Sequence, residues 1–249
     1  MKHEFLDRYG SLSSPIHRLD ARAKLIGFFV AILVVVSEPT FDVAAFGLYF
    51  GLIGLIVLIS RVPLDFLARR CLIAGPFILL AALLILLVGG GESTVAAGMG
   101  AKARLPLALA VLMKGLAAIL LLTLLTATDR FHRLLRALRL LRLPGLLGEL
   151  SAFMYRYIFI LTDEMQRTSM ARSSRTPGRL RVSRFRTIGN QAATVFVRGY
   201  DRSQRVYQAM CARGFQGHFP QAVPLRFGMT DAVALTLLIA SFLAVRIGI

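Results

Sequence analysis

The sequence predicts an all-α membrane protein that crosses the bilayer about five times and carries a helical region on the cytoplasmic side. Of its 249 residues, 56% are hydrophobic and 17% are charged, and the mean hydropathy of +0.67 is well above the soluble range. The net charge of +17 is concentrated in residues 129–227, which contain 18 of the 30 basic residues and only five acidic ones. An Arg at the bilayer centre costs roughly 2.5–3.5 kcal/mol, so this interval lies outside the hydrocarbon.

These patterns divide the chain into three regions. Residues 1–128 form an N-terminal region with about four transmembrane helices, residues 129–227 form cytoplasmic helices, and residues 228–249 form a C-terminal transmembrane helix. The expected spans are Leu25–Val36, Val43–Ile59, Cys71–Val88, Leu105–Thr126 and Met229–Val245. The first is shorter than the roughly 20 residues that a span needs, so it crosses only if Arg22 and Lys24 reach the interface.

The connections between the spans are predicted from their polar and glycine residues. Arg61–Arg70 is expected to be a polar connection, and Gly89–Arg104 a loop, because Gly89-Gly90-Gly91 does not sustain a helix. Asp20 is a predicted N-cap for a helix that begins at Ala21.

The distribution of basic residues predicts the orientation of the chain in the membrane. With the N-terminus inside, the connection after the second span and the whole basic interval face the cytoplasm. Only Lys102, Arg104 and Arg246 then lie outside, and the fifth span leaves the C-terminus outside. Lys114 lies within a span, and we favour an amine that extends to the interface or pairs inside the complex over a functional site.

The basic interval contains three amphipathic helical patterns. The first places apolar residues from Phe131 to Leu141, with Arg at every third position from Arg130 to Arg142, and Pro144-Gly145 ends it. This Arg spacing resembles a voltage sensor, but the pattern is too short to span and the spans contain almost no acidic partners. Voltage sensing is therefore excluded.

The second and third patterns each end near an Arg. The second has its apolar stripe at Leu150, Phe153, Met154, Tyr157, Ile158, Leu161 and Met165, with Asp163 and Glu164 supporting the helix through Arg167. It stops at Pro177-Gly178, soon after Arg172. The third runs from Ile188 to Met210 and ends at Arg213, followed by Gly214 as a predicted C′ glycine. The Arg residues can engage carboxylates or carbonyls of a protein partner, or hold the chain to anionic membrane lipid, and the composition favours neither.

The sequence indicates no chemistry of its own. It has no G-x-x-x-x-G-K-[ST] phosphate loop, and its four His and two Cys show no metal-ligand spacing. No Ser-His-Asp or Cys-His arrangement is present either. We therefore expect a non-catalytic chain without a bound cofactor.

Four features of the sequence resemble a known family. They are Asp7-Arg8-Tyr9 with the run from Ser14 to Leu25; Arg156-Tyr157 to Glu164 with Arg167 to Arg172; Ala209 to Phe215; and spans alternating with one large cytoplasmic part. Together they cover most of the chain, and they resemble the transmembrane T component of energy-coupling factor transporters, particularly the cobalt-type CbiQ proteins.

The resemblance implies a function, a location and partners. It implies a coupling subunit of a cobalt importer in the bacterial cytoplasmic membrane, linked to cobalamin biosynthesis, with nickel or vitamin uptake as alternatives. The expected partners are a pair of ABC-type ATPase subunits, which bind ATP, and a substrate-capturing membrane subunit.

The resemblance also implies the site residues. Two Ala-Arg-Gly-type triplets dock onto the ATPases in that family, and by position they are Ala171, Arg172, Ser173 and Ala212, Arg213, Gly214. Ser173 stands where the family has Gly. This leaves the backbone conformation at residue 173 an open question, but not the assignment of Arg172.

Two other classes of function are weaker alternatives. A self-sufficient ion channel or carrier is disfavoured because the spans contain few polar groups. A membrane-anchored basic scaffold that binds nucleic acid is disfavoured because aromatic residues do not alternate with the basic ones, so no nucleic-acid partner is expected.

Overall fold

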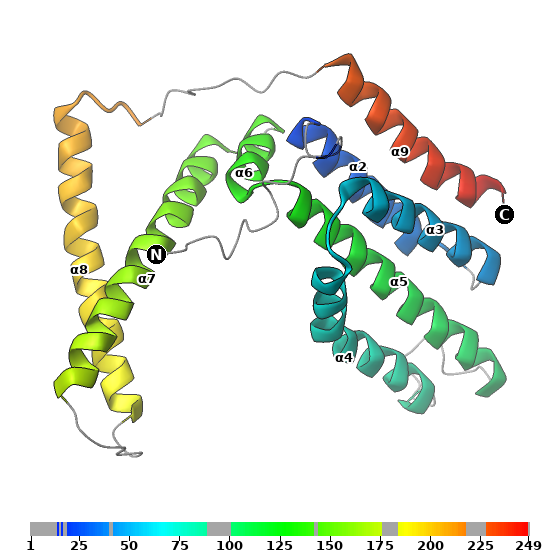
Figure 1. Cartoon of the computed structure of the whole chain (residues 1–249), viewed down its shortest axis with the longest axis horizontal. Coiled ribbons are helices and arrows are strands. Elements are labelled where there is room, and N and C mark those ends of the chain that lie inside the picture. Colours follow the sequence, from blue (N-terminus) through cyan, green and yellow to red (C-terminus); the bar gives the residue numbers. More distant parts are fainter. Residues whose placement is uncertain are drawn as a thin grey trace. The chain divides into compact units, whose positions relative to one another are not determined.

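The chain folds into helices throughout the part that its computed structural model describes. This part comprises Ser14, Ile16 and residues 19–39, 42–88, 101–141, 144–175, 184–217 and 228–248. It contains eight helices and no strand, which confirms the all-α prediction (Figure 1). Asp7-Arg8-Tyr9, Pro15, His17 and Arg18 of the N-terminal stretch that carries the family resemblance lie outside the described residues, as does Pro177-Gly178. The chain separates into two compact units, Lys2–Ala137 with Leu225–Ile249, and Leu138–Pro224.

The first unit is a bundle of five apolar helices, α2 (Ala21–Val36), α3 (Val43–Ser60), α4 (Leu64–Val88), α5 (Ala101–Thr128) and α9 (Met229–Gly248). Helices α2 and α3 both contact α5 and α9, while α4 packs along α5. The core is formed by large side chains from α2, α3, α5 and α9, chiefly Phe28, Tyr49, Ile53, Leu121, Leu124 and Phe242. The rings of Tyr49 and Phe242 stack with their centroids 5.9 Å apart, which joins α3 to α9.

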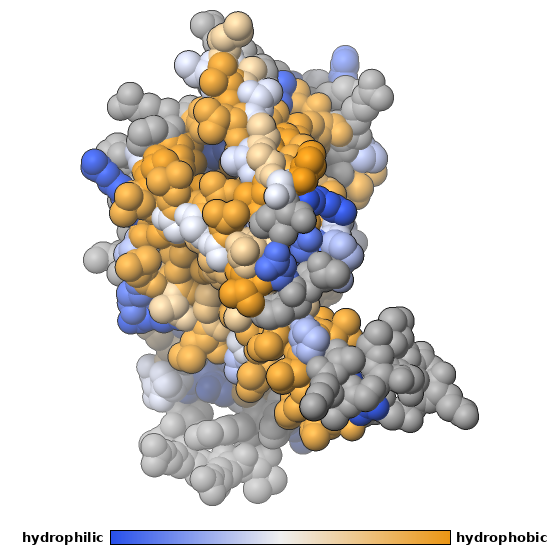
Figure 2. Space-filling view, turned by 90° about the vertical axis from the view of Figure 1, so that its right-hand side faces the viewer, coloured by the Kyte–Doolittle hydropathy of each residue, from blue (hydrophilic) through white to orange (hydrophobic). Residues whose placement is uncertain are grey.

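Four of these helices, α3, α4, α5 and α9, are long and apolar enough to cross a membrane. Exposed apolar side chains cover them, as at Leu72 (77% exposed) and Phe77 (83% exposed) of α4, and Figure 2 shows a face on which apolar residues predominate. Helix α2 is not among the four, because its 16 residues rise only about 24 Å. Its buried residues instead make it a central part of the bundle core.

Two helices, α4 and α5, begin earlier than the sequence predicts, within segments that were expected to be connections. Helix α4 starts at Leu64, so most of Arg61–Arg70 is helical rather than a polar connection. The side chains of Asp65 and Arg69 form an i,i+4 ion pair at 3.1 Å, which a helix accommodates on its exposed side. Helix α5 starts at Ala101, so the end of Gly89–Arg104 is also helical, because its glycines stop at Gly100. Residues 89–100 lie outside the described part.

The predicted cap at the start of α2 is confirmed. Asp20 has an extended backbone, and its Oδ1 accepts a hydrogen bond of 3.0 Å from the N–H of Arg22.

Lys114 is paired inside this chain. Its Nζ donates to the backbone carbonyl of Glu38 at 2.6 Å, just after α2 ends, and the hydroxyl of Tyr49 donates to the carboxylate of the same Glu38 at 3.2 Å.

The second unit contains two long helices, α7 (Gly145–Arg175) and α8 (Arg184–Ala212). The short α6 (Phe131–Leu140) precedes them, and it matches the first amphipathic pattern of the basic interval. The chain passes from the first unit to the second within α6, since Ala137 belongs to the first and Leu138 to the second.

Candidate functional site

The candidate site is the pair of helices α7 and α8. They run antiparallel, since Gln191 of α8 lies beside Met165 of α7, while Gly199 lies beside the earlier Leu161. The Gln191 amide donates to the carbonyl of Met165 at 3.0 Å. Gly199 allows the close contact, because a Cβ there would lie 3.1 Å from a methyl of Leu161. These contacts fix the register of the two helices.

An ion pair joins the same two helices on their polar side. The guanidinium of Arg198 donates to Glu164 Oε1 at 2.6 Å. This hydrogen bond, with the nearby charges of Arg198, Arg167 and Arg202, holds the pKa of the Glu164 carboxyl below its ordinary value. The pair is partly exposed, so it specifies the register more than it stabilises the helices.

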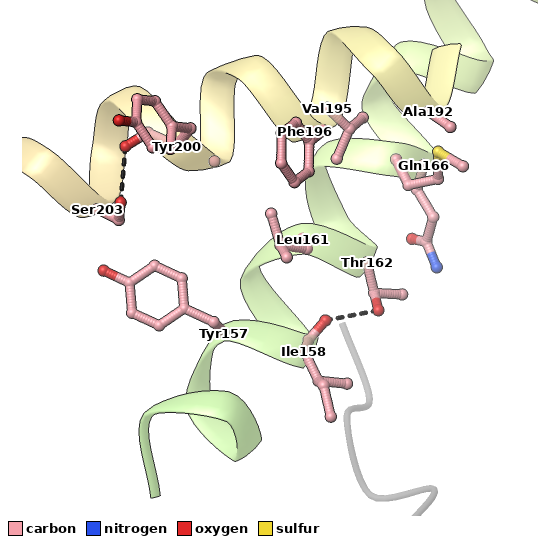
Figure 3. Close-up of a pocket in the computed structure, with 12 residues that line it drawn as sticks. Tyr157, Ile158, Leu161, Thr162, Gln166, Ala192, Val195, Phe196, Tyr200 and Ser203 are labelled. Atoms are coloured by element: carbon pink, nitrogen blue, oxygen red, sulfur yellow. Dashed lines mark hydrogen bonds between the residues drawn. The ribbon is translucent and has the colours of Figure 1, made fainter. Parts of the chain in front are cut away.

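An apolar groove of about 740 Å³ lies between α7 and α8 (Figure 3). Its lining includes Tyr157, Leu161 and Met165 from the predicted stripe of α7, and Val195 and Phe196 from the stripe of α8. Phe196 is 74% exposed although it lies on this apolar stripe. The groove therefore offers a surface for another apolar segment.

The first candidate docking triplet lies in the last turns of α7. Ala171 and Ser173 are exposed and Arg172 is half-buried, all within the helix that continues to Arg175. The hydroxyl of Ser173 donates to the carbonyl of Met170 at 2.8 Å. Ser173 thus continues the helix, so no special glycine conformation is needed there.

The second triplet ends α8 through a Schellman motif, in which a left-handed glycine closes the helix. Gly214 has a φ of +80°, as expected of the predicted C′ glycine. The N–H groups of Gly214 and Phe215 donate to the carbonyls of Cys211 and Met210, both at 3.0 Å. Arg213 is the exposed residue at the turn between Ala212 and Gly214.

The structure does not bring the two triplets together. In the antiparallel pair, Arg172 lies beyond Met165 at one end, whereas Arg213 lies beyond Gly199 at the other. At 1.5 Å of rise per residue their separation along the helices is on the order of 40 Å. Neither guanidinium forms an ion pair with a described residue, in contrast to Arg139 and Arg198, which pair with Glu149 and Glu164.

In the part of the chain that the structure describes, no three His, Cys, Asp or Glu side chains gather into a group that could hold a metal ion.

The first unit holds a buried ion pair that the sequence did not predict. Lys24 of α2 pairs with Asp129, which follows α5. From the sequence, Lys24 is expected to reach the interface, and Asp129 is only the first residue of the basic interval. The available signal was a charge on the face of α2 that also carries the small residues Ala21, Gly27 and Ala31, which favour close packing.

The sequence is similar to proteins of cobalt transport. A family model described as "Cobalt transport protein", CbiQ, matches residues 12–225. The cobalt transport protein CbiQ of Rhodobacter capsulatus is 29% identical over 246 residues, covering 96% of this chain and 98% of that protein. An uncharacterized protein of Methanocaldococcus jannaschii is 28% identical over 74 residues, a match that covers 30% of this chain and 28% of that protein's length.

Proposed function

Since this chain belongs to the CbiQ family of cobalt transport proteins, we propose that it is the transmembrane coupling subunit of an ATP-driven importer of the energy-coupling factor type. In this role it passes movement from a pair of ABC-type ATPase subunits to a membrane subunit that captures the substrate. The cargo is a cobalt ion, as in the name of the relative in Rhodobacter capsulatus.

The observation that carries this proposal is the placement of Arg172 and Arg213 at opposite ends of one antiparallel helix pair. A separation on the order of 40 Å suits two attachment points, one for each subunit of an ATPase dimer. A guanidinium carries a planar set of donors that suits carboxylates or carbonyls of a partner.

The rest of the helix pair supports the same role. Ser173 and Gly214 give the two ends different local structures, but each leaves an Arg at or near the end of a long helix. Movement of one end of such a helix is carried along its length. The groove around Phe196 adds an apolar surface that a partner helix can cover.

The basic residues support a cytoplasmic position for α7 and α8. All 18 basic residues of 129–227 are Arg, and this interval lies between apolar helices that cross the membrane. By the positive-inside rule, the Arg residues next to these apolar helices support a position of the helix pair on the side where ATP is available.

A double charge reversal tests the docking assignment. The variant Arg172→Glu/Arg213→Glu is expected to insert into the membrane normally, to lose co-purification with the ATPase subunits and to lose ATP-dependent cobalt uptake. The matched control, Arg156→Glu/Arg205→Glu, reverses two exposed charges of the same helices away from the triplets and should keep both activities. ATP-dependent uptake by the first variant at the control's level would overturn the assignment.

The alternative classes have their own readouts in the same preparations. The purified chain alone in liposomes should show no cobalt or nickel flux, which a self-sufficient channel or carrier would show. Competition of cobalt uptake by excess nickel separates the two cargoes. The chain should also show no steeply salt-dependent affinity for DNA, which a nucleic-acid scaffold would show.

A further inference from the structure

A buried ion pair lies at the turn where α5 ends and α6 begins. Lys24 of α2 is 3% exposed and Asp129 is 1% exposed. The Lys24 amine lies 2.5 Å from Asp129 Oδ2 and also donates to the carbonyl of Thr128, the last residue of α5, at 3.2 Å. Removing one partner would leave a buried charge without compensation, so the pair holds this turn in one position on α2.

Further hydrogen bonds hold the start of α2 in place beside this pair. The N–H of Asp20 donates to Asp231 Oδ1, in the first turn of α9, at 2.9 Å. The other carboxylate oxygen of Asp231 accepts from the N–H of Gly228 at 2.8 Å. The beginnings of α2 and α9 and the end of α5 thus share one end of the bundle, where buried polar groups fix them to each other.

Asp129 also contacts α6. The helix follows Asp129 almost directly, since the carbonyl of Arg130 accepts from the N–H groups of Arg133 and Leu134. The second oxygen of Asp129 lies 3.5 Å from the guanidinium of Arg133, which is in the first turn of α6. One carboxylate therefore contacts the bundle through Lys24 and the first turn of α6 through Arg133.

A second ion pair holds the other end of α6. The guanidinium of Arg139 lies 2.8 Å from Glu149 Oε1 of α7, and both side chains are largely buried. The aliphatic part of Arg139 lies over Gly148, where an added Cβ would be 3.2 Å from Arg139 Cδ. Helix α6 thus begins at an ion pair within the bundle unit and ends at one within the unit of α7 and α8.

We infer that Lys24 and Asp129 are positioning residues for energy coupling, which hold the start of α6 on the bundle so that movement of α7 reaches the membrane helices. This inference rests on the proposed function. Movement of α7 passes to α6 through Glu149 and Arg139, and from the first turn of α6 to α2 through Asp129 and Lys24. Without the buried pair, the turn between α5 and α6 would move relative to α2. ATP hydrolysis would then continue without productive movement of the bundle.

The test measures cobalt uptake and ATP hydrolysis in the same liposomes, using the complete complex with its ATPase and substrate-capturing subunits. Lys24→Met/Asp129→Leu replaces the ion pair by an apolar pair and leaves no buried charge unpaired. We expect complex assembly and ATP hydrolysis to persist while cobalt uptake per ATP falls roughly tenfold, a size typical of coupling through a contact network. The control Arg130→Gln removes an exposed charge next to Asp129 and should leave the ratio unchanged.

A second variant keeps the inference falsifiable if the first does not assemble. Arg139→Gln/Glu149→Gln removes the ion pair at the other end of α6, away from the bundle core, and should lower uptake per ATP in the same way. If cobalt uptake per ATP is unchanged in an assembled Lys24→Met/Asp129→Leu complex, or in this second variant, this inference is overturned and the proposed function is not. A purely structural role would lower yield or thermal stability without changing the ratio. A wild-type complex without ATP-driven uptake would instead overturn the proposed function, and the inference with it.

Discussion

Among the described glycines, Gly115 has the shortest contact for an added Cβ, and its replacement by alanine gives a sharp test of the helix packing. A Cβ at this position of α5 would lie 2.7 Å from Cγ2 of Ile78 on α4, and 3.1 Å from both Cγ1 and Cδ1. Carbon atoms in favourable contact are about 3.5–4.0 Å apart. Because Cγ2 is attached directly to the branched Cβ of Ile78, it cannot rotate away without moving the rest of the side chain.

The expected cost follows from two opposing effects. Overpacking of this kind costs roughly 1–3 kcal/mol, whereas alanine is favoured over glycine in a helix by about 1 kcal/mol. Gly51 of α3 is the matched control, since nothing lies within 4 Å of an added Cβ there. The helix preference is common to both variants, so Gly115→Ala should be less stable than Gly51→Ala by roughly 1–3 kcal/mol, or about 2–12 °C in Tm.

The assay is thermal unfolding of the purified variants in one detergent, followed by far-ultraviolet circular dichroism at a fixed scan rate. In a double-mutant cycle, Ile78→Ala should relieve the cost of Gly115→Ala, because it removes all three contacting carbons. Ile78→Val keeps both γ carbons and should relieve it much less. If Gly115→Ala unfolds at or above the temperature of Gly51→Ala, the close approach of α4 and α5 is refuted.

Three further predictions concern single groups. The hydrogen bond from Arg198 lowers the pKa of Glu164, so the stability that this pair contributes is complete above the ordinary pKa of about 4.3 and is lost as the pH falls through the lower folded pKa. Across this pH range the unfolding temperature should therefore fall less steeply for Glu164→Gln than for the wild type, and equal slopes would contradict the pairing. Lys114→Met removes a charged hydrogen bond to the carbonyl of Glu38 and should cost roughly 1.5–3 kcal/mol in the same unfolding assay, so an unchanged Tm would contradict the contact. A membrane-impermeant maleimide should label the exposed Cys211 in inverted vesicles and not in intact cells, and the opposite result would reverse the proposed orientation.

The sequence was sufficient for the elements whose signal is local. Apolar runs located the helices, and the cap at Asp20 was correct, because the side chain and the backbone groups it satisfies are close in sequence. The glycine cap at Gly214 was correct for the same reason. The start of α4 was wrong because charged residues such as Asp65 and Arg69 lower hydropathy without breaking a helix, and the start of α5 was wrong because the glycines of the predicted loop end at Gly100.

The contacts between helices could not be read from periodicity. Glu164 was assigned to Arg167 on its own helix, but its hydrogen bond comes from Arg198 on α8, since the register of two helices depends on their packing. Gly47 and Gly51 stand four residues apart on α3, a spacing typical of close helix packing, yet added Cβ atoms there would meet nothing within 4 Å. The close approach occurs at Gly115, where Ile78 fills the space that a side chain would need.

Lys24 and Lys114 are charged residues of the apolar bundle, and each donates a hydrogen bond to a backbone carbonyl. Lys24, near the start of α2, donates to the carbonyl of Thr128 at the end of α5. Lys114 of α5 donates in turn to the carbonyl of Glu38, just after the end of α2. Each lysine therefore satisfies a carbonyl at the C-terminal end of the other helix, where the helix dipole favours a positive charge. Both lysine charges are thus used within the chain to join α2 and α5.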